Sequence, residues 1–275
     1  MKNNIYLSII TLSKNDNKEF LRTAQSIFSQ NNTINIEWLI IDGSDDDIQK
    51  SKKKLIKKIY NNSNKKNILI KHINSVEKKI YGIYPCMNYG KKISLGRFII
   101  FLNSGDEFFN NYSMQILLQN TYKLKDKKSL IFGQANIISS KKIHWFFPGK
   151  RLKNIDKWLN FFEPNHQSML ISKELAEMYD FSLSHSLISD GNWKRKIINN
   201  SNHIIYINKP IIKFYLDGAS STKPSKKLLL EIISNTNISI IRKFIFLVKY
   251  YIPKKFFIFY HLMQKYKCIF FDLIF

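Results

Sequence analysis

Residues 97–106 read RFIIFLNSGD, and this stretch is the strongest indication of the fold. Its first part, 97–102, is a short apolar run, which is typical of a strand buried inside a parallel sheet. The run stops at four small or polar residues, Asn103 to Asp106, as expected where a strand ends in a turn. Ligand sites of parallel α/β sheets lie beyond the C-terminal ends of the strands, so the stretch predicts a strand and a candidate site.

Upstream of this stretch, strand-like apolar runs alternate with segments of helical periodicity. The predicted strands cover 5–12, 36–41 and 68–73, and the predicted helices cover 18–30, 47–60 and 84–95. Such alternation is typical of a parallel α/β sheet with helices on its faces. Thr11 and Asp42 also stand at the ends of predicted strands. Polar residues follow many strands, but three such positions together favour a nucleotide-binding cleft.

The chain downstream is less regular. We expect a strand at 130–138, an irregular aromatic stretch at 140–165, a short strand and a helix within 166–180, a helix at 187–198, and two short strands at 203–207 and 211–216 separated by Asn208-Lys209-Pro210. The composition shifts near residue 222. We therefore predict one main domain over 1–222, built of two halves that meet near residue 110, and a separate segment over 223–275.

Composition and charge exclude several classes of protein. Hydrophobic residues make up 44% of the 275 residues, which excludes a mainly disordered chain. The two cysteines, Cys86 and Cys268, exclude a disulfide scaffold and a multi-cysteine zinc site. The formal net charge of +24 will attract phosphates, anionic lipids or nucleic acid. The sequence contains no GxGxxG, P-loop or GxSxG motif, which disfavours dinucleotide oxidoreductases, P-loop kinases and α/β-hydrolases.

The C-terminal segment, 223–275, is both basic and aromatic, with 10 basic and 2 acidic residues. Lysines interrupt its apolar runs, so none approaches the ~20 residues that a membrane-spanning helix needs. A basic, aromatic, amphipathic segment is suited to lying in a membrane interface, and we favour that interpretation. The alternative is a helical hairpin packed on the domain. The N-terminus lacks an apolar region of signal-peptide type, so we expect the protein in the cytosol.

Several segments together resemble family 2 glycosyltransferases with the GT-A fold. They are SIITLSKN, SIFSQ, EWLIIDGS, GIYPCMNYGKKISLGRFIIFLNSGDEFF, NHQSMLIS, SLISDGNW and KFYLDGASST. The sequence is most similar to bacterial exopolysaccharide and O-antigen enzymes of the colanic-acid fucosyltransferase type, over roughly residues 5–222. The resemblance implies an α/β GT-A fold with a mainly parallel central sheet. It also implies transfer of a sugar, with inversion, from a nucleotide-diphosphate sugar.

The family's acidic DxD-type motif falls on Asn103 to Asp106. The resemblance implies that Asp106 binds Mg²⁺ or Mn²⁺ and that Asn103 and Ser104 contact the nucleotide sugar. Such cations prefer oxygen ligands and substrate phosphates. Asn103 and Gly105 stand where the family has acids, so Asp106 is the one charged ligand left in the motif. Gly105 would let the backbone approach the phosphates closely.

Three further positions match residues that line the donor site in the family. Thr11 and Asp42 match contacts to the nucleoside, although Asp42 has an alternative role as a turn cap. Asn88 lies in a segment that borders the sugar. There, Pro85 and Cys86 replace the usual Asp-Ala pair. This departure leaves the donor open and is also compatible with a weakened enzyme.

Asp190 matches the family's catalytic base, in a Ser-Asp pair that opens a late helix. A sugar hydroxyl must lose its proton as it attacks the anomeric carbon, and a positioned carboxylate takes that proton. The alternative role of Asp190 is a helix N-cap. His166 belongs to the matching His-Gln pair, and the resemblance implies a contact to a phosphate or to the acceptor. A purely structural histidine is the alternative.

Together these features indicate a glycosyltransferase bound peripherally to the cytoplasmic side of the bacterial inner membrane. Its N-terminal half would bind a UDP- or GDP-sugar, and its second half a polyprenyl-diphosphate-linked glycan of O-antigen, capsule or exopolysaccharide synthesis. The segment 223–275 would bind the membrane surface, and the oligomeric state stays open. One alternative is a catalytically inactive GT-A scaffold. The other is a nucleic-acid-binding protein, which the dispersed lysines and the missing RNA-binding signatures disfavour, so we expect no nucleic acid partner.

Overall fold

The computed structural model describes residues 5–216, apart from residues 32, 64, 66, 123, 125–127, 140–142 and 184–188, and then residues 226–234, 243–244, 247, 250–251 and 257–274. The strands are β1 (Leu7–Ser13), β2 (Ile36–Asp42), β3 (Ile68–Asn74), β4 (Phe98–Phe101), β5 (Glu107–Phe108), β6 (Ser129–Ile138), β7 (His144–Phe147), β8 (Met169–Ser172) and β9 (His203–Tyr215). The helices are α1 (Asn17–Phe28), α2 (Asp46–Asn62), α3 (Ile83–Ile93), α4 (Ser113–Gln119), α5 (Ile155–Phe161), the 3₁₀ turn η1 (His166–Ser168), α6 (Lys173–Glu177), α7 (Ser189–Asn199), α8 (Lys226–Ser234) and α10 (Phe257–Ile274).

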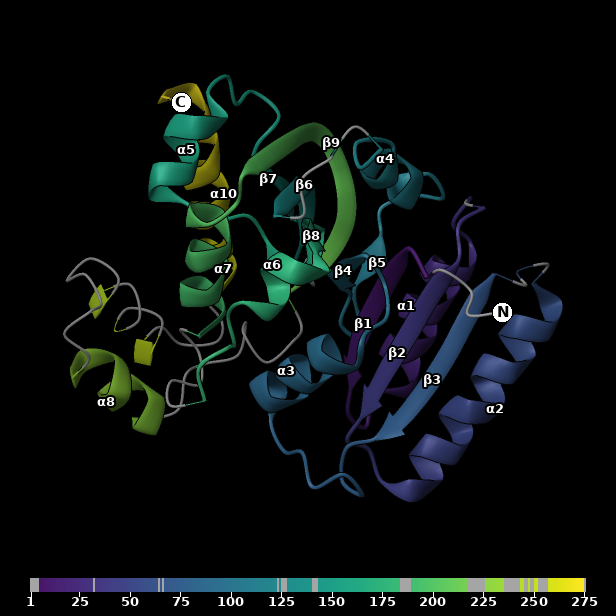
Figure 1. Cartoon of the computed structure of the whole chain (residues 1–275). Helices are drawn as coiled ribbons and strands as arrows, with labels where there is room; N and C mark the ends of the chain where they lie inside the picture. Colours follow the sequence, from purple (N-terminus) through teal and green to yellow (C-terminus); the bar gives the residue numbers. More distant parts are fainter. Residues whose placement is uncertain are drawn as a thin grey trace.

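All of these strands belong to one sheet in the order β3-β2-β1-β4-β8-β6-β9-β5, with β7 paired to β6. The first four strands are parallel to one another. β8 runs antiparallel to both β4 and β6, and β6 pairs with β9 in parallel. Figure 1 shows the N-terminal strands lying between α2 and α3. The structure confirms the predicted α/β fold, and it brings the C-terminal ends of β1, β2 and β4 to one edge of the sheet.

Alternate side chains of the strands build two separate hydrophobic cores, one on each face of the sheet. On β1, Ile9 packs into the core that contains Phe20 of α1, together with residues of α2 and α4. The next residue, Ile10, packs into the core that contains Met87 of α3 and Trp193 of α7. Each fully buried side chain of this size stabilises the fold by about 1.5–3 kcal/mol. The second core therefore holds α3 and α7 on the same face of the sheet.

One prediction about the second half of the chain was wrong. The two short strands expected around Asn208-Lys209-Pro210 are one continuous strand, β9, paired with β6. The register shifts between Gly133 and Ala135 of β6, opposite this stretch. Because proline has no backbone N–H, it fits into a strand at such an irregularity without losing a ladder bond. The stretch expected to be irregular, 140–165, also contains a short strand and a helix, β7 and α5.

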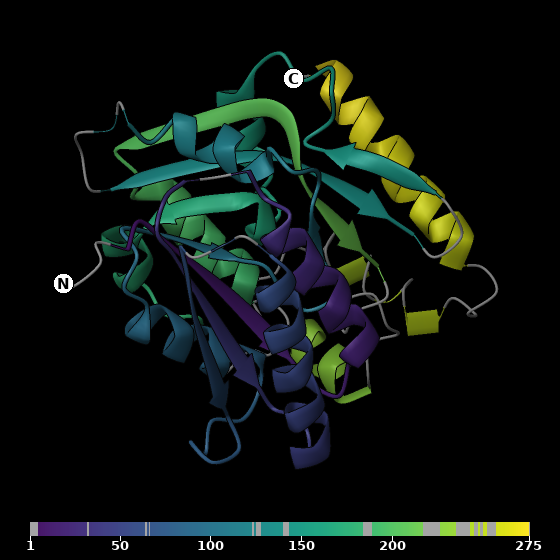
Figure 2. The same ribbon diagram turned by 90° about the vertical axis from the view of Figure 1, so that its right-hand side faces the viewer.

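The last described helix of the C-terminal segment, α10, packs against β7. Figure 2 shows α10 running alongside β7. On this helix the ring of His261 forms a hydrogen bond of 3.1 Å with Ser139, and Cys268 packs against the core. Among the described residues, no helix has both the length and the apolar character needed to span a bilayer. The predicted boundary at residue 222 lies outside the described residues.

Candidate functional site

The loop after β4 is held in shape by α1. Gly105 has a φ of 101°, which glycine adopts without strain. Its N–H donates to Thr23 Oγ1 at 2.9 Å, and its carbonyl accepts from Arg22 Nε at 2.9 Å. Both backbone groups of Gly105 are therefore used by α1. This conformation does not offer them to a phosphate, contrary to the role expected from the sequence.

The carboxylate of Asp106 is buried and fully engaged. It is 6% exposed, Oδ1 accepts from the Tyr215 N–H at 2.9 Å, and Oδ2 accepts from the Gln167 side chain. The amide oxygen of Gln167 in turn accepts from the Asn103 N–H at 3.0 Å. Burial raises the pKa of Asp106 to about 7, against the lowering effect of these hydrogen bonds and of Arg22. Asp106 thus ties β9 and η1 to the end of β4.

These residues do not fit a divalent cation held by Asp106. Both carboxylate oxygens point at donors of the chain, and the neighbouring acid, Glu107, accepts from the Tyr215 hydroxyl at 2.6 Å and lies 3.5 Å from Lys213 Nζ. Within the part of the chain that the structure describes, no three His, Cys, Asp or Glu side chains converge as a metal-binding group. Mg²⁺ and Mn²⁺ sites are normally built on one or two carboxylates facing the substrate phosphates. The DxD-like position of this chain has no such carboxylate.

A second group of charged side chains lies at the start of α7. The side chain of Asp190 is 33% exposed, and its Oδ2 lies 3.6 Å from Lys194 Nζ, one turn along the helix, and 4.0 Å from His166 Nδ1. Burial alone would raise the pKa of Asp190, but the charge of Lys194 and the Gly191 N–H outweigh it and the pKa is lowered. Asp190 is therefore an ionised, accessible carboxylate at neutral pH.

His166 faces this carboxylate as a neutral imidazole. Its burial, assisted by the charge of Lys194, lowers the pKa of His166 to about 4 against the attraction of Asp190. Tyr84, at the start of α3, lies near Asp190, and burial and then the charge of Asp190 raise the pKa of its phenol. Tyr84, Lys194 and Gln167 were missed by the sequence prediction. Tyr84 and Gln167 stand inside motifs that the prediction used, but their side-chain directions depend on the fold.

Within the part of the chain that the structure describes, several buried polar atoms without a hydrogen-bond partner lie in the segments that form this cluster. They include Asn103 Oδ1, Ser104 Oγ, His166 Nε2 and Ser189 Oγ. Asn103 is linked to η1 through Gln167, and His166 is linked to α7 through Asp190. Buried polar groups are nearly always hydrogen-bonded in folded proteins, so a concentration of unpaired ones indicates a place where a polar ligand binds. The structure thus brings together four of the predicted residues, Asn103, Ser104, His166 and Asp190.

Asp42 lies at the end of β2 inside a buried polar network. Its Oδ1 accepts from the Ser44 N–H at 3.0 Å and lies 3.3 Å from Lys52 Nζ, and its Oδ2 lies 2.9 Å from His72 Nε2. Burial would raise the pKa of Asp42, but His72, Ser44 and Lys52 together lower it to about 2. The side chain is fully buried. It acts as the turn cap that the sequence left as its alternative role, since it accepts from a residue two positions ahead.

Thr11 and Asn88 are also engaged within the protein. The Thr11 hydroxyl is fully buried, donates to the Leu102 carbonyl at 2.8 Å and accepts from Trp38 Nε1 at 2.9 Å. Asn88 on α3 forms two hydrogen bonds of 2.9 Å with the backbone N–H and carbonyl of Phe181. In this conformation Thr11 joins three strands and Asn88 attaches α3 to the chain ahead of α7. The donor-site roles expected for Thr11 and Asn88 stay predictions.

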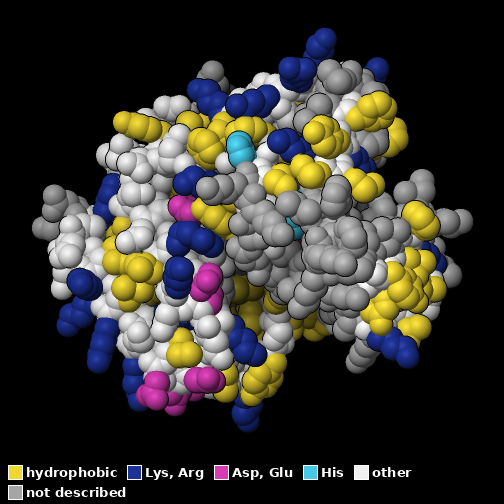
Figure 3. Space-filling model, turned by 180° about the vertical axis from the view of Figure 1, so that it is seen from behind, with side chains coloured by type: hydrophobic (Ala, Val, Ile, Leu, Met, Phe, Trp, Pro, Cys, Tyr) yellow, Lys and Arg dark blue, Asp and Glu magenta, His cyan; other side chains and the backbone are white. Residues whose placement is uncertain are grey.

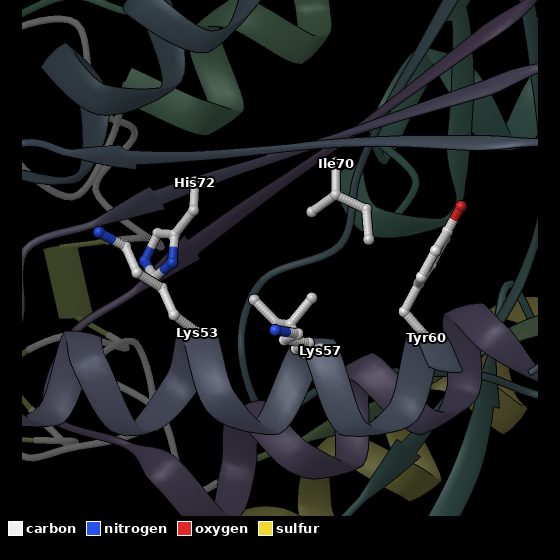
Figure 4. A pocket seen from close by; sticks show the side chains of 6 residues that line it. Lys53, Lys57, Tyr60, Ile70 and His72 are labelled. Atoms are coloured by element: carbon white, nitrogen blue, oxygen red, sulfur yellow. The ribbon is translucent and has the colours of Figure 1, made fainter. Parts of the chain in front are cut away.

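A shallow hollow of about 210 Å³ lies between α2 and β3. It is lined by Lys53, Ile56, Lys57, Tyr60, Ile70 and His72. Figure 4 shows Lys53 of α2 next to the ring of His72 on β3, with Lys57 further along the helix. None of its lining residues belongs to the Asp190 cluster, and one of them, His72, is bonded to Asp42.

Comparisons with known proteins identify the fold. Neither a family model nor a curated protein matches the sequence. Solved structures of TarS from S. aureus are similar. Residues 1–349 of TarS align with a TM-score of 0.59 and 16% identity, over 90% of this chain and 70% of that chain. The same fragment aligns with a TM-score of 0.59 and 15% identity in its complex with UDP, and with a TM-score of 0.58 and 14% identity in its complex with UDP-GlcNAc. At such identities the likeness shows a shared fold, and it agrees with the predicted GT-A type.

Proposed function

We propose that this chain is a glycosyltransferase that moves a sugar, with inversion, from a UDP- or GDP-sugar to a lipid-linked glycan of a bacterial surface polysaccharide. The observation that carries the proposal is the cluster around Asp190. It combines an ionised, partly exposed carboxylate with unpaired buried polar atoms at the C-terminal edge of the sheet. The shared fold with TarS, whose structures hold UDP and UDP-GlcNAc, supports a nucleotide-sugar donor.

In the proposed reaction the acceptor hydroxyl lies beside Asp190. Its oxygen forms a bond to the anomeric carbon while the bond from that carbon to the diphosphate oxygen breaks, and the electron pair leaves with the diphosphate. The hydroxyl proton passes to Asp190, which is ionised because Lys194 lowers its pKa. A single displacement of this kind inverts the anomeric carbon. Neutral His166 lies 4.0 Å from the same carboxylate, and Tyr84 lies near it.

The direct test is sugar transfer from UDP- and GDP-sugars to an extract of lipid-linked glycans, with Asp190→Asn as the variant. Loss of a general base costs about 10²–10⁴-fold in rate. The matched control is Asp156→Asn, because Asp156 also lies in the first turn of a helix and is exposed. We expect the control to retain the wild-type rate. Transfer by Asp190→Asn at the wild-type rate would refute the assignment of the base.

The transfer assay, together with measurements of nucleotide and RNA binding, separates the alternatives. A catalytically inactive scaffold would bind a nucleotide diphosphate but transfer no sugar to any acceptor. A nucleic-acid-binding protein would bind random RNA in a strongly salt-dependent way. Among the described residues on the face shown in Figure 3, lysine and arginine side chains stand at several separate places. This dispersion favours the small anionic substrates over a nucleic acid strand.

We further propose that the chain works at the cytoplasmic surface of the bacterial inner membrane and that α10 contacts the lipid. Met263, Tyr266 and Phe270 follow one another at helical spacing and are 67%, 64% and 60% exposed. Lys267 is exposed next to this apolar stripe, while His261 on the same helix contacts the domain. An apolar stripe flanked by basic residues is suited to an anionic lipid interface. This placement fits an acceptor carried on a polyprenyl diphosphate.

Sedimentation with vesicles tests the membrane proposal. We expect the protein to bind phosphatidylcholine vesicles that contain phosphatidylglycerol, and the triple change Met263→Ser, Tyr266→Ser and Phe270→Ser to weaken binding. Tyr112→Ser is the control, since Tyr112 is 55% exposed on α4's N-terminal side, away from α10. Equal binding of the wild type to neutral and anionic vesicles would contradict the proposal, whatever the folding of the variant.

A further inference from the structure

The Asp190 cluster contains a cationic side chain, whereas the sequence led us to expect a metal ion at Asp106. Lys194 is 13% exposed at its side chain, and its ammonium nitrogen lies 3.6 Å from Asp190 Oδ2. The charge of Lys194 lowers the pKa of His166 as well as the pKa of Asp190. By contrast, Asp106 is turned into the protein, with Tyr215 and Gln167 on its two oxygens.

We propose that sugar transfer at this site needs no divalent cation and that Lys194 supplies the positive charge that balances the departing diphosphate. The inference rests on the proposed function. Before the reaction, the charges of Lys194 and Asp190 cancel, and His166 is neutral. When Asp190 takes the proton of the acceptor hydroxyl, the charge of Lys194 is no longer balanced. Negative charge develops on the leaving diphosphate at the same moment. The positive charge of Lys194 therefore stabilises the transition state more than the ground state.

The buried carboxylate explains why the NSGD loop keeps an acid without a metal. Asp106 accepts from β9 and from η1, so it holds the loop against the second half of the domain. Asn103 Oδ1 and Ser104 Oγ, the unpaired atoms of this loop, are neutral. Neutral oxygen atoms receive hydrogen bonds from a ribose or a sugar, whereas a hard cation next to phosphates is usually bound through at least one carboxylate. The loop is therefore built to recognise hydroxyls.

The first experiment measures binding of UDP and of GDP to the wild-type protein by calorimetry, once with excess EDTA and once with excess Mn²⁺. We expect one nucleotide to bind with dissociation constants that agree within about threefold under the two conditions, a difference below 1 kcal/mol. Transfer of sugar should persist in EDTA. Binding or transfer that requires Mn²⁺ would overturn this inference and leave the proposed function standing. Absence of binding by both nucleotides under both conditions would overturn the proposed function, and the inference with it.

The second experiment tests Lys194 itself. We expect Lys194→Met to lower kcat by about 10²-fold, in the range measured for single transition-state-stabilising groups, with a much smaller change in KM. The acidic limb of the pH–rate profile should move to higher pH, because Asp190 loses the charge that lowers its pKa. Lys194→Arg should recover activity, since it keeps the charge. The control is Lys196→Met, an exposed lysine of the same helix. A wild-type kcat and pH profile in Lys194→Met would refute the role.

Discussion

Replacing Lys52 by methionine is expected to destabilise the protein more than any other lysine change on α2. The Lys52 side chain is completely buried, and its ammonium lies 2.7 Å from Asp16 Oδ1, 3.3 Å from Asp42 Oδ1 and 2.8 Å from Ser44 Oγ. It also donates to Ser13 Oγ. One ammonium group thus joins the ends of β1 and β2 to α2.

The magnitude follows from what the change leaves behind. Methionine fills most of the volume of the lysine stem, so the loss of packing is small. The buried carboxylate of Asp42 remains, however, without its cation. Removing one partner of a buried ion pair costs about 3–5 kcal/mol, which is a large part of the about 5–15 kcal/mol by which a domain is stable. The double variant Lys52→Met/Asp42→Asn should be more stable than Lys52→Met, because it removes the stranded charge.

Urea unfolding at neutral pH, followed by circular dichroism, measures these free energies. The control is Lys54→Met, an exposed lysine of the same helix, which should change the free energy of unfolding by less than about 0.5 kcal/mol. The folded pKa of Asp42, about 2, lies below its unfolded value of 3.8, so its contribution is complete above pH 4 and is lost as the pH falls towards 2. In Lys52→Met the folded pKa of Asp42 should rise towards its unfolded value, so this acid-induced loss should become smaller. A Lys52→Met protein as stable as Lys54→Met would refute the network as a source of stability.

Three further outcomes are expected. Thr11→Val should destabilise the protein by about 1–3 kcal/mol in urea unfolding, because it leaves Trp38 Nε1 and a buried carbonyl unpaired, yet nucleotide affinity measured by calorimetry should not change. Asn88→Ala should cost about 1–3 kcal/mol, since two hydrogen bonds to the Phe181 backbone are lost; an unchanged free energy of unfolding would contradict this. The folded pKa of Asp106, about 7, exceeds its unfolded value of 3.8, so its contribution is present below pH 4 and is lost as the pH rises through 7. The wild type should therefore lose stability relative to Asp106→Asn between pH 4 and pH 7, and parallel pH profiles would contradict the burial of the charge.

Local sequence patterns were sufficient for the architecture of the N-terminal half. The apolar runs that became β1, β2 and β3 end within one residue of the predicted positions. β1 and β2 are buried along almost their whole length, and strands buried on both faces are mostly apolar, whereas β3 is a partly exposed edge strand. The Ser-Asp pair at the start of α7 was likewise recognisable. Prediction failed at β9, where Pro210 stands at a register shift between β9 and β6 that the local sequence does not reveal.

The sequence alone determined the alternation of strands and helices in the N-terminal half, the polar loop after β4 and the carboxylate that opens α7. Each of these features depends on residues only a few positions apart. Only the tertiary structure decided what each polar side chain faces. Thr11, Asp42 and Asn88 are bonded inside the protein, and Asp106 meets Tyr215, more than 100 residues along the chain. Whether a carboxylate binds a ligand or holds two strands together depends on which donors the fold brings to it. Those donors come from distant segments, so no local pattern contains this information.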